Sequence, residues 1–250
     1  MEIVSVTTER NDLAESLFWD PAGQCLTWID AWRASVHSLD LPTGRVQVAD
    51  FAAALGGRPI GSIARHSAGG LIGGVKGGFY RLHPACGEAE RLHDAEQERP
   101  STNRLNDGKC DRAGWFWCAS INTDHKTASG ALWCFAAGSA PELMRDGLVA
   151  GNGIAWSPDD AFMYLADTLG GSVWRYDFDP ATGEIANERL FISTADIGGG
   201  VDGATVDSDG CYWAALFRGG AVGQFDPDGK LMRRIELPVS DPTIFAFGGP

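Results

Sequence analysis

Polar side chains recur at one position ahead of a repeated turn. Counting eight residues back from the last residue of each turn reaches Glu15, Asn106, Asn152 and Asp202, and Gly61 in the remaining repeat. Two carboxylates and two carboxamides offer only oxygen ligands, which suit a hard or borderline divalent cation such as Ca²⁺, Mg²⁺ or Mn²⁺. The alternative is that Asn and Asp are turn residues that bond their own backbone. Because one of the four is Glu, a poor turn former, the shared register favours a metal site.

The turns define a repeat that runs along the whole chain. They read WDPAG, RHSAG, CDRAG, WSPDD and VDSDG, end at residues 23, 69, 114, 160 and 210, and are separated by 46, 45, 46 and 50 residues. An aromatic or β-branched run follows each turn, and third and fourth strand-like runs follow that. Four short antiparallel strands per repeat of roughly 45 residues are typical of a β-propeller blade. The register position then lies just before each innermost strand, so that its side chains converge on the central axis.

The last ten residues set the expected number of blades. The segment DPTIFAFGGP has the spacing of one more innermost strand. The sequence therefore predicts an all-β, six-bladed propeller with four-stranded antiparallel blades, one domain over residues 1–250, whose sixth blade is incomplete at the C-terminus. On this interpretation the sequence is a fragment, and an extension of roughly 40 residues is expected to raise its melting temperature and its metal affinity.

Composition and charge exclude several classes of partner. The chain has 33 glycines, nine tryptophans and a formal net charge of −13. An acidic protein lacks the basic patch that binding to nucleic acid or to an anionic membrane requires. The N-terminus does not resemble a signal segment, so a soluble cytoplasmic protein is expected. The six cysteines and five histidines show no metal-binding or redox spacing, and the cysteines suit a reducing compartment.

Four stretches carry a resemblance to a known family. They are ESLFWDPAGQCLTWID, RLNDGKCDRAGWFWCAS, GNGIAWSPDDAFMYLADT and VDGATVDSDGCYWAALF, and they resemble the senescence-marker, gluconolactonase and regucalcin-like six-bladed propellers. The resemblance implies one divalent metal (Ca, Zn, Mn, Mg or Fe(II)), held by Glu15, Asn152 and Asp202. It implies that Arg104 and Asn106 contact a small sugar lactone, such as gluconolactone or a pentonolactone, and that Asp202 is the catalytic acid/base. One departure is Ser16–Leu17 after Glu15, where the family usually has Gly-Pro.

The implied chemistry is the hydrolysis of a cyclic ester to an aldonic acid. A cation can polarise the lactone carbonyl, and a carboxylate beside it can accept a proton from water and return it to the ring oxygen. Arg104 offers a planar fork of donors, and Asn106 can donate and accept at once. The sequence contains no Gly-x-Ser-x-Gly motif, which disfavours a covalent acyl-enzyme.

Other interpretations stay open at this point. Asp107 is expected to shape its loop, Lys109 to be a solvated strand residue, and Asp167 to support the site or end a strand. The alternative functions are a related propeller esterase or organophosphatase, and a non-catalytic calcium-binding propeller. The lack of a His in the ligand register counts against the former, and Arg104 beside that register counts against the latter. The oligomeric state, the sugar and the native metal are left undetermined.

Overall fold

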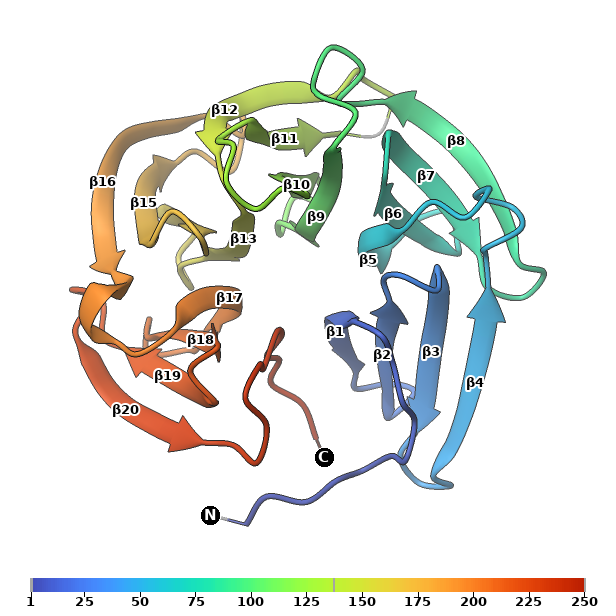
Figure 1. Ribbon diagram of the computed structural model, residues 1–250, viewed down its shortest axis with the longest axis horizontal. Coiled ribbons are helices and arrows are strands. Elements are labelled where there is room, and N and C mark those ends of the chain that lie inside the picture. Colours follow the sequence, from blue (N-terminus) through green and yellow to red (C-terminus); the bar gives the residue numbers. More distant parts are fainter. Residues whose placement is uncertain (1, 137, 250) are drawn as a thin grey trace.

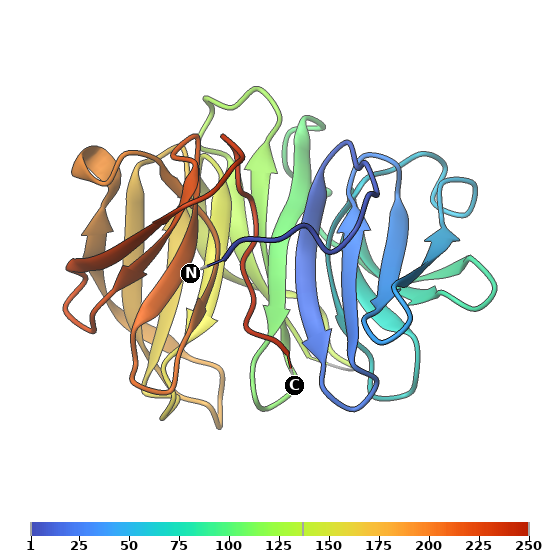
Figure 2. The ribbon, with the colours of Figure 1, turned by 90° about the horizontal axis from the view of Figure 1, so that it is seen from below.

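Twenty β-strands form five antiparallel sheets of four strands in the computed structural model, which describes residues 2–136 and 138–249. The sheets are arranged radially about a central axis as the blades of a propeller (Figure 1). Within every sheet the strands are hydrogen-bonded in chain order, and the first strand is the innermost. Seen from the side, the innermost strands run along the axis (Figure 2).

The blades are numbered in chain order. Blade 1 contains β1 (Ala14–Asp20), β2 (Cys25–Asp30), β3 (Ser35–Asp40) and β4 (Arg45–Asp50). Blade 2 contains β5 (Ile60–Arg65), β6 (Leu71–Val75), β7 (Gly78–His83) and β8 (Glu88–Asp94). Blade 3 contains β9 (Asn103–Cys110), β10 (Phe116–Asn122), β11 (Gly130–Phe135) and β12 (Glu142–Leu148). Blade 4 contains β13 (Gly151–Trp156), β14 (Phe162–Asp167), β15 (Ser172–Phe178) and β16 (Ile185–Ser193), followed by the 3-10 turn η1 (Thr194–Asp196). Blade 5 contains β17 (Gly200–Val206), β18 (Tyr212–Phe217), β19 (Ala221–Phe225) and β20 (Leu231–Glu236).

The all-β class and the four-stranded repeat are confirmed, but the prediction of six blades is wrong. Residues 237–249 contain no strand, although they lie between blade 5 and blade 1 (Figures 1 and 2). A few hydrogen bonds hold this segment. Leu237 N–H donates to Gly220 O (2.8 Å), Gly220 N–H donates to Ser240 O (3.0 Å), Gly203 N–H donates to Thr243 O (2.7 Å), and Thr243 Oγ1 donates to Ala14 O (2.7 Å). A strand needs a ladder of such bonds, and the innermost strand of a blade forms that ladder with the second strand of the same blade.

The recurrent turns owe their composition to local hydrogen bonds. In blade 3, Asp111 accepts hydrogen bonds from the Trp115 N–H (2.9 Å) and from the Trp117 indole N–H (2.9 Å). In blade 5, Asp207 accepts in the same way from Cys211 N–H (2.8 Å) and from the Trp213 indole (2.7 Å). One carboxylate thus closes the first turn and fixes the aromatic residue of the second strand, which explains why the sequence repeats Asp before the turn and Trp after it.

The hydrophobic core lies between neighbouring blades. Trp117 of blade 3 packs with Met163 and Leu165 of blade 4, and Tyr164 of blade 4 packs with Tyr212 of blade 5. Full burial of each such side chain contributes roughly 1.5–3 kcal/mol. Because these clusters join neighbouring blades, they set how the innermost strands are placed around the axis. No helix among the described residues has the length and apolarity needed to cross a bilayer.

Candidate functional site

A β-bulge marks the register position in all five innermost strands. The pairing shifts between Glu15 and Phe18 in β1, beside Gly61 in β5, across Asn106 in β9, after Asn152 in β13 and across Asp202 in β17. A bulge adds residues to one strand, increases the local twist and redirects a side chain. The register residues therefore lie inside the innermost strands, not just before them as expected, and each occurs where its strand is bent.

The five predicted site residues line one cavity. Glu15, Arg104, Asn106, Asn152 and Asp202 surround a space of about 240 Å³ at the end of the axis where the innermost strands begin. They come from blades 1, 3, 4 and 5. In blade 2 the same position is Gly61. A Cβ added at this residue would overlap the backbone carbonyls of Leu105 and Asn106. Blade 2 contributes no side chain here because β9 packs directly against it.

A chain of hydrogen bonds links the polar residues of the cavity. Arg104 Nη1 donates to Asn106 Oδ1 (2.7 Å), and Asn106 Nδ2 donates to Asn152 Oδ1 (2.8 Å). Asn152 Nδ2 then donates to the Thr168 hydroxyl (2.7 Å), which donates to Val201 O (2.6 Å). The chain crosses from blade 3 through blade 4 to blade 5, so these side chains are held in fixed orientations.

Two carboxylates face the cavity without a neutralising cation close to each. Burial raises the pKa of Glu15, and the negative charges of Asp202 and Asp107 raise it further. Burial and the charge of Asp107 also raise the pKa of Asp202. Burial lowers the pKa of the Arg104 guanidinium, although Glu15 and Asp202 oppose this shift. Arg104 alone therefore does not offset the repulsion between the carboxylates, and a bound cation would stabilise both.

The oxygen donors fit a metal ion. Glu15 and Asp202 supply carboxylates and Asn152 supplies an amide oxygen, which is the ligand chemistry of hard divalent cations. Within residues 2–136 and 138–249, no group of three or more His, Cys, Asp and Glu side chains is arranged to hold a metal. The predicted ligands are Glu15, Asn152 and Asp202. Only two of these three residues are of those types, so the predicted site is not a group of that kind.

Ser16 takes the backbone conformation expected of the glycine that it replaces. Its φ is 55°, and Gly153, which follows Asn152 at the corresponding place in blade 4, has a φ of 59°. The departure from the family pattern therefore leaves the left-handed turn after Glu15 intact. A non-glycine residue in this region costs roughly 1–2 kcal/mol, so other contacts must hold Ser16 in place.

Three residues near the cavity had expected roles that can be compared with their contacts in the structure. Asp107 lies inside β9 and accepts a hydrogen bond from Ile154 N–H (3.2 Å) of blade 4, so it joins two blades and does not merely shape a loop. Lys109 was expected to be solvated, but its ammonium group donates to Ala204 O (2.6 Å) of blade 5. Asp167 ends β14 and accepts from Val149 N–H and Ala150 N–H (2.9 Å each), which supports the strand that carries Asn152.

The cavity also contains residues that sequence reasoning missed. Trp32, His125, Thr168 and Arg218 line it, and all four lie in turns between the second and third strands of their blades. The Arg104 guanidinium carbon lies 5.0 Å from the centre of the Trp32 ring, so Trp32 covers the cationic side of the cavity. These turns occupy the same place in each blade but share no residue type, so a comparison between repeats gives no signal for these residues.

The fold and the site define a class of protein, an all-β propeller with an oxygen-lined cavity at one end of its axis. The chain belongs to the SMP-30/gluconolactonase/LRE-like family, whose model matches residues 13–250. It is 33% identical to 6-deoxy-6-sulfogluconolactonase of Pseudomonas putida, over 98% of this chain and 82% of that protein. It is 30% identical to pentonolactonase of Haloferax volcanii, over 100% and 82% of the two chains. The crystal structure of the calcium-binding protein regucalcin from Agrobacterium tumefaciens superimposes with a TM-score of 0.90 at 27% identity, over 98% of this chain and 81% of that one.

Proposed function

We propose that this protein hydrolyses a sugar lactone, an aldonolactone such as gluconolactone or a pentonolactone, to its aldonic acid. The observation that carries the proposal is the hydrogen-bonded series Arg104–Asn106–Asn152, which lines one cavity with the carboxylates of Glu15 and Asp202. The names of the relatives support it, since two of them are lactonases of different sugars.

The proposed site uses a divalent metal held by Glu15, Asn152 and Asp202. When bound, such an ion polarises the lactone carbonyl and acidifies water. The Agrobacterium relative is called a calcium-binding protein, which supports a metal without fixing its identity. The site residues themselves then orient the substrate and move the proton.

Asp202 is the proposed acid and base. Its buried carboxylate accepts a proton from the attacking water while the water oxygen bonds to the lactone carbonyl carbon. As the bond between that carbon and the ring oxygen breaks, Asp202 returns the proton to the ring oxygen, so that one water molecule is consumed. Burial raises the pKa of Asp202, and a bound cation would oppose that shift and keep the carboxylate ionised, as a base requires.

Arg104 and Asn106 are proposed to position the substrate. Arg104 is buried, and its Nη1 is already directed at Asn106, so little freedom remains to be lost when a sugar binds. Asn106 Nδ2 also donates to Gly151 O (3.0 Å), which keeps its amide plane fixed. Two fixed side chains can hold the hydroxyl groups and the carbonyl of a lactone in one orientation.

A proton-release assay on metal-stripped protein tests the proposal. Gluconolactone and pentonolactones are supplied with Ca²⁺, Zn²⁺, Mn²⁺ or Mg²⁺ added back singly, and spontaneous opening is subtracted. Turnover that depends on one of these metals is expected. Metal binding without turnover of any lactone would favour a calcium-binding propeller, and turnover of aryl esters or organophosphates instead of lactones would favour the related esterases.

A further inference from the structure

Arg218 stands at the rim of the cavity with no partner of its own. It follows β18, lines the cavity and is exposed, and its guanidinium carbon lies 5.2 Å from the centre of the Phe217 ring, which lines the same cavity. In the part of the chain that the structure describes, no carboxylate pairs with this guanidinium and no carbonyl accepts from it. Its donors therefore face the cavity mouth unused.

The rim positions are held by a disfavoured backbone. Arg218 has a φ of 59°, and His125, in the turn between β10 and β11, also has a φ of 59°. Left-handed backbone in residues other than glycine is uncommon, and it occurs often where a site requires a particular side chain. Trp32, with 49% of its surface exposed, forms a third part of the rim. An arginine, a histidine and a half-exposed tryptophan thus surround the entrance.

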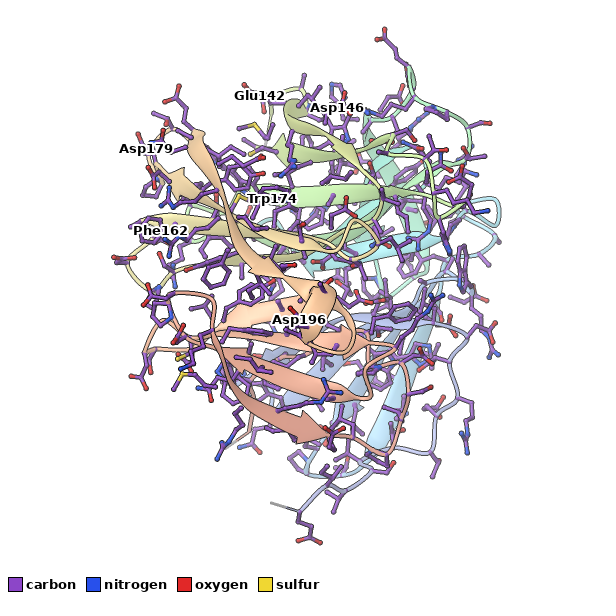
Figure 3. The ribbon with its side chains drawn as sticks, turned by 60° about the vertical axis from the view of Figure 1, so that its left-hand side comes forward. Glu142, Asp146, Phe162, Trp174, Asp179 and Asp196 are labelled. Carbon is purple, nitrogen blue, oxygen red and sulfur yellow. The ribbon has the colours of Figure 1, made fainter. Side chains whose placement is uncertain are left out.

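The cavity lining has equal numbers of acidic and basic side chains, unlike the acidic chain as a whole. The chain carries a formal net charge of −13, and Figure 3 shows Glu142, Asp146, Asp179 and Asp196 spread over the outer side of blades 3 and 4. In the cavity, the charges of Glu15 and Asp202 are balanced by those of Arg104 and Arg218 before any metal binds. A divalent cation would leave the cavity with an excess of positive charge, which attracts anions into an otherwise acidic molecule.

We infer that the substrate is an anionic lactone, in which a carboxylate, sulfonate or phosphate at the end remote from the carbonyl is bound by Arg218. This inference rests on the proposed function. Arg104, the proposed metal ligands and Arg218 line the same cavity, so a lactone whose carbonyl lies at Arg104 can direct its far end toward the Arg218 guanidinium, whose fork of donors matches the oxygens of such a group. His125 and Trp32 line the same cavity from blades 3 and 1, where they offer a ring nitrogen and an apolar surface for the sugar carbons.

The test compares matched lactones on the metal-loaded protein. Gluconolactone is measured against lactones of the same sugar that carry a sulfonate, a phosphate or a carboxylate at carbon 6, and the three arms identify the anion. At least one anionic lactone is expected to exceed gluconolactone in kcat/KM by about tenfold, and Arg218→Gln is expected to remove that advantage, so that the ratio of the two kcat/KM values falls to about one. Arg218→Lys should retain part of it. The matched control is Arg233→Gln, which removes an exposed arginine of the same blade from β20.

The outcomes separate this inference from the proposed function. If gluconolactone is turned over but no anionic lactone surpasses it, or if Arg218→Gln slows all lactones equally, the anion site is refuted and the lactonase proposal stands. If no lactone is turned over, the proposed function fails. Calorimetry then still tests the site with 6-phosphogluconate and gluconate as probes: Arg218→Gln should weaken only the former, about tenfold, and an equal affinity of both probes for the wild type would overturn the inference.

Discussion

The hydroxyl group of Ser16 is bonded to both backbone groups of Ile63. Ser16 Oγ donates to Ile63 O (3.1 Å) and accepts from Ile63 N–H (2.8 Å). Ser16 belongs to the innermost strand of blade 1 and Ile63 to that of blade 2, so one side chain fastens the two strands at the bulge that presents Glu15. These bonds offset the cost of the left-handed backbone at Ser16, and they show how this chain does without the usual glycine.

The first prediction concerns that fastening. Ser16→Ala should lower the free energy of unfolding by about 1–3 kcal/mol, because it leaves two buried backbone groups of Ile63 unpaired while the left-handed φ remains. Ser16→Gly loses the same bonds but relieves the backbone, so it should cost about 1 kcal/mol less. Urea denaturation measures both, with the exposed Ser67→Ala as control. Equal stability of Ser16→Ala and wild type would show that the bonds to Ile63 contribute nothing.

A second prediction concerns the glycine in the register of blade 2. Gly61→Ala places a methyl group against the carbonyls of Leu105 and Asn106, so β9 must move. We expect a loss of about 1–3 kcal/mol of stability, together with a fall in turnover, because β9 carries Arg104 and Asn106. Gly44→Ala is the control, since it has a φ of 68° but nothing within 4 Å of the added carbon. It should lose some stability and keep its activity, and the same result for Gly61→Ala would contradict the prediction.

The sequence was most informative where structure is set locally. The turns of Asp111 and Asp207 could be identified because a single carboxylate closes each turn and fixes the following Trp within six residues. Once the turns were aligned, the register of Glu15, Asn152 and Asp202 followed from the rotational relation between blades.

What the sequence could not supply depends on neighbours that are distant in the chain. The number of blades was predicted wrongly because the segment DPTIFAFGGP resembles an innermost strand in pattern, whereas residues 241–249 form no strand ladder in the structure. Lys109 was misjudged because its acceptor, Ala204 O, lies 95 residues further along. Trp32 and Arg218 were missed because the second-to-third strand turns share a place in the fold but not a residue type.

A third prediction concerns the pH dependence of stability. Burial lowers the pKa of His37 below its ordinary value of 6.5, so the folded protein binds a proton at this ring less readily than the unfolded chain does. Stability should therefore be fully present above about pH 6.5 and should fall as the pH decreases toward the folded pKa. His37→Gln should flatten the slope of unfolding free energy between pH 7 and 5, measured by denaturant titration at each pH. An unchanged slope would assign the dependence to other groups.

The fourth prediction separates substrate positioning from metal binding. Arg104→Ala should lower kcat/KM for a lactone by about a hundredfold, because a small loss of alignment has an effect of that order. Arg104→Lys should recover little, since an ammonium lacks the planar fork. Metal affinity measured by calorimetry should stay at the wild-type value in both variants, as it should in the surface control Arg233→Ala. Kinetics like those of the wild type would remove Arg104 from the site.

The last prediction uses the repulsion between Glu15 and Asp202. Mutation of a residue that only supports a metal ligand typically weakens metal binding by about 10- to 100-fold. Glu15→Gln removes a proposed ligand, so it should weaken the binding of the divalent metal by more than this. The same change should stabilise the metal-free protein, because it removes a carboxylate whose pKa is raised by burial and by the charge of Asp202. A purely structural residue would instead lower stability in both states. Calorimetry measures the affinity, and melting temperatures with and without metal measure the two stabilities. Glu90→Gln on β8 is the control, since it removes an exposed carboxylate outside the cavity. Unchanged metal affinity in Glu15→Gln would show that the shared register does not mark a metal site.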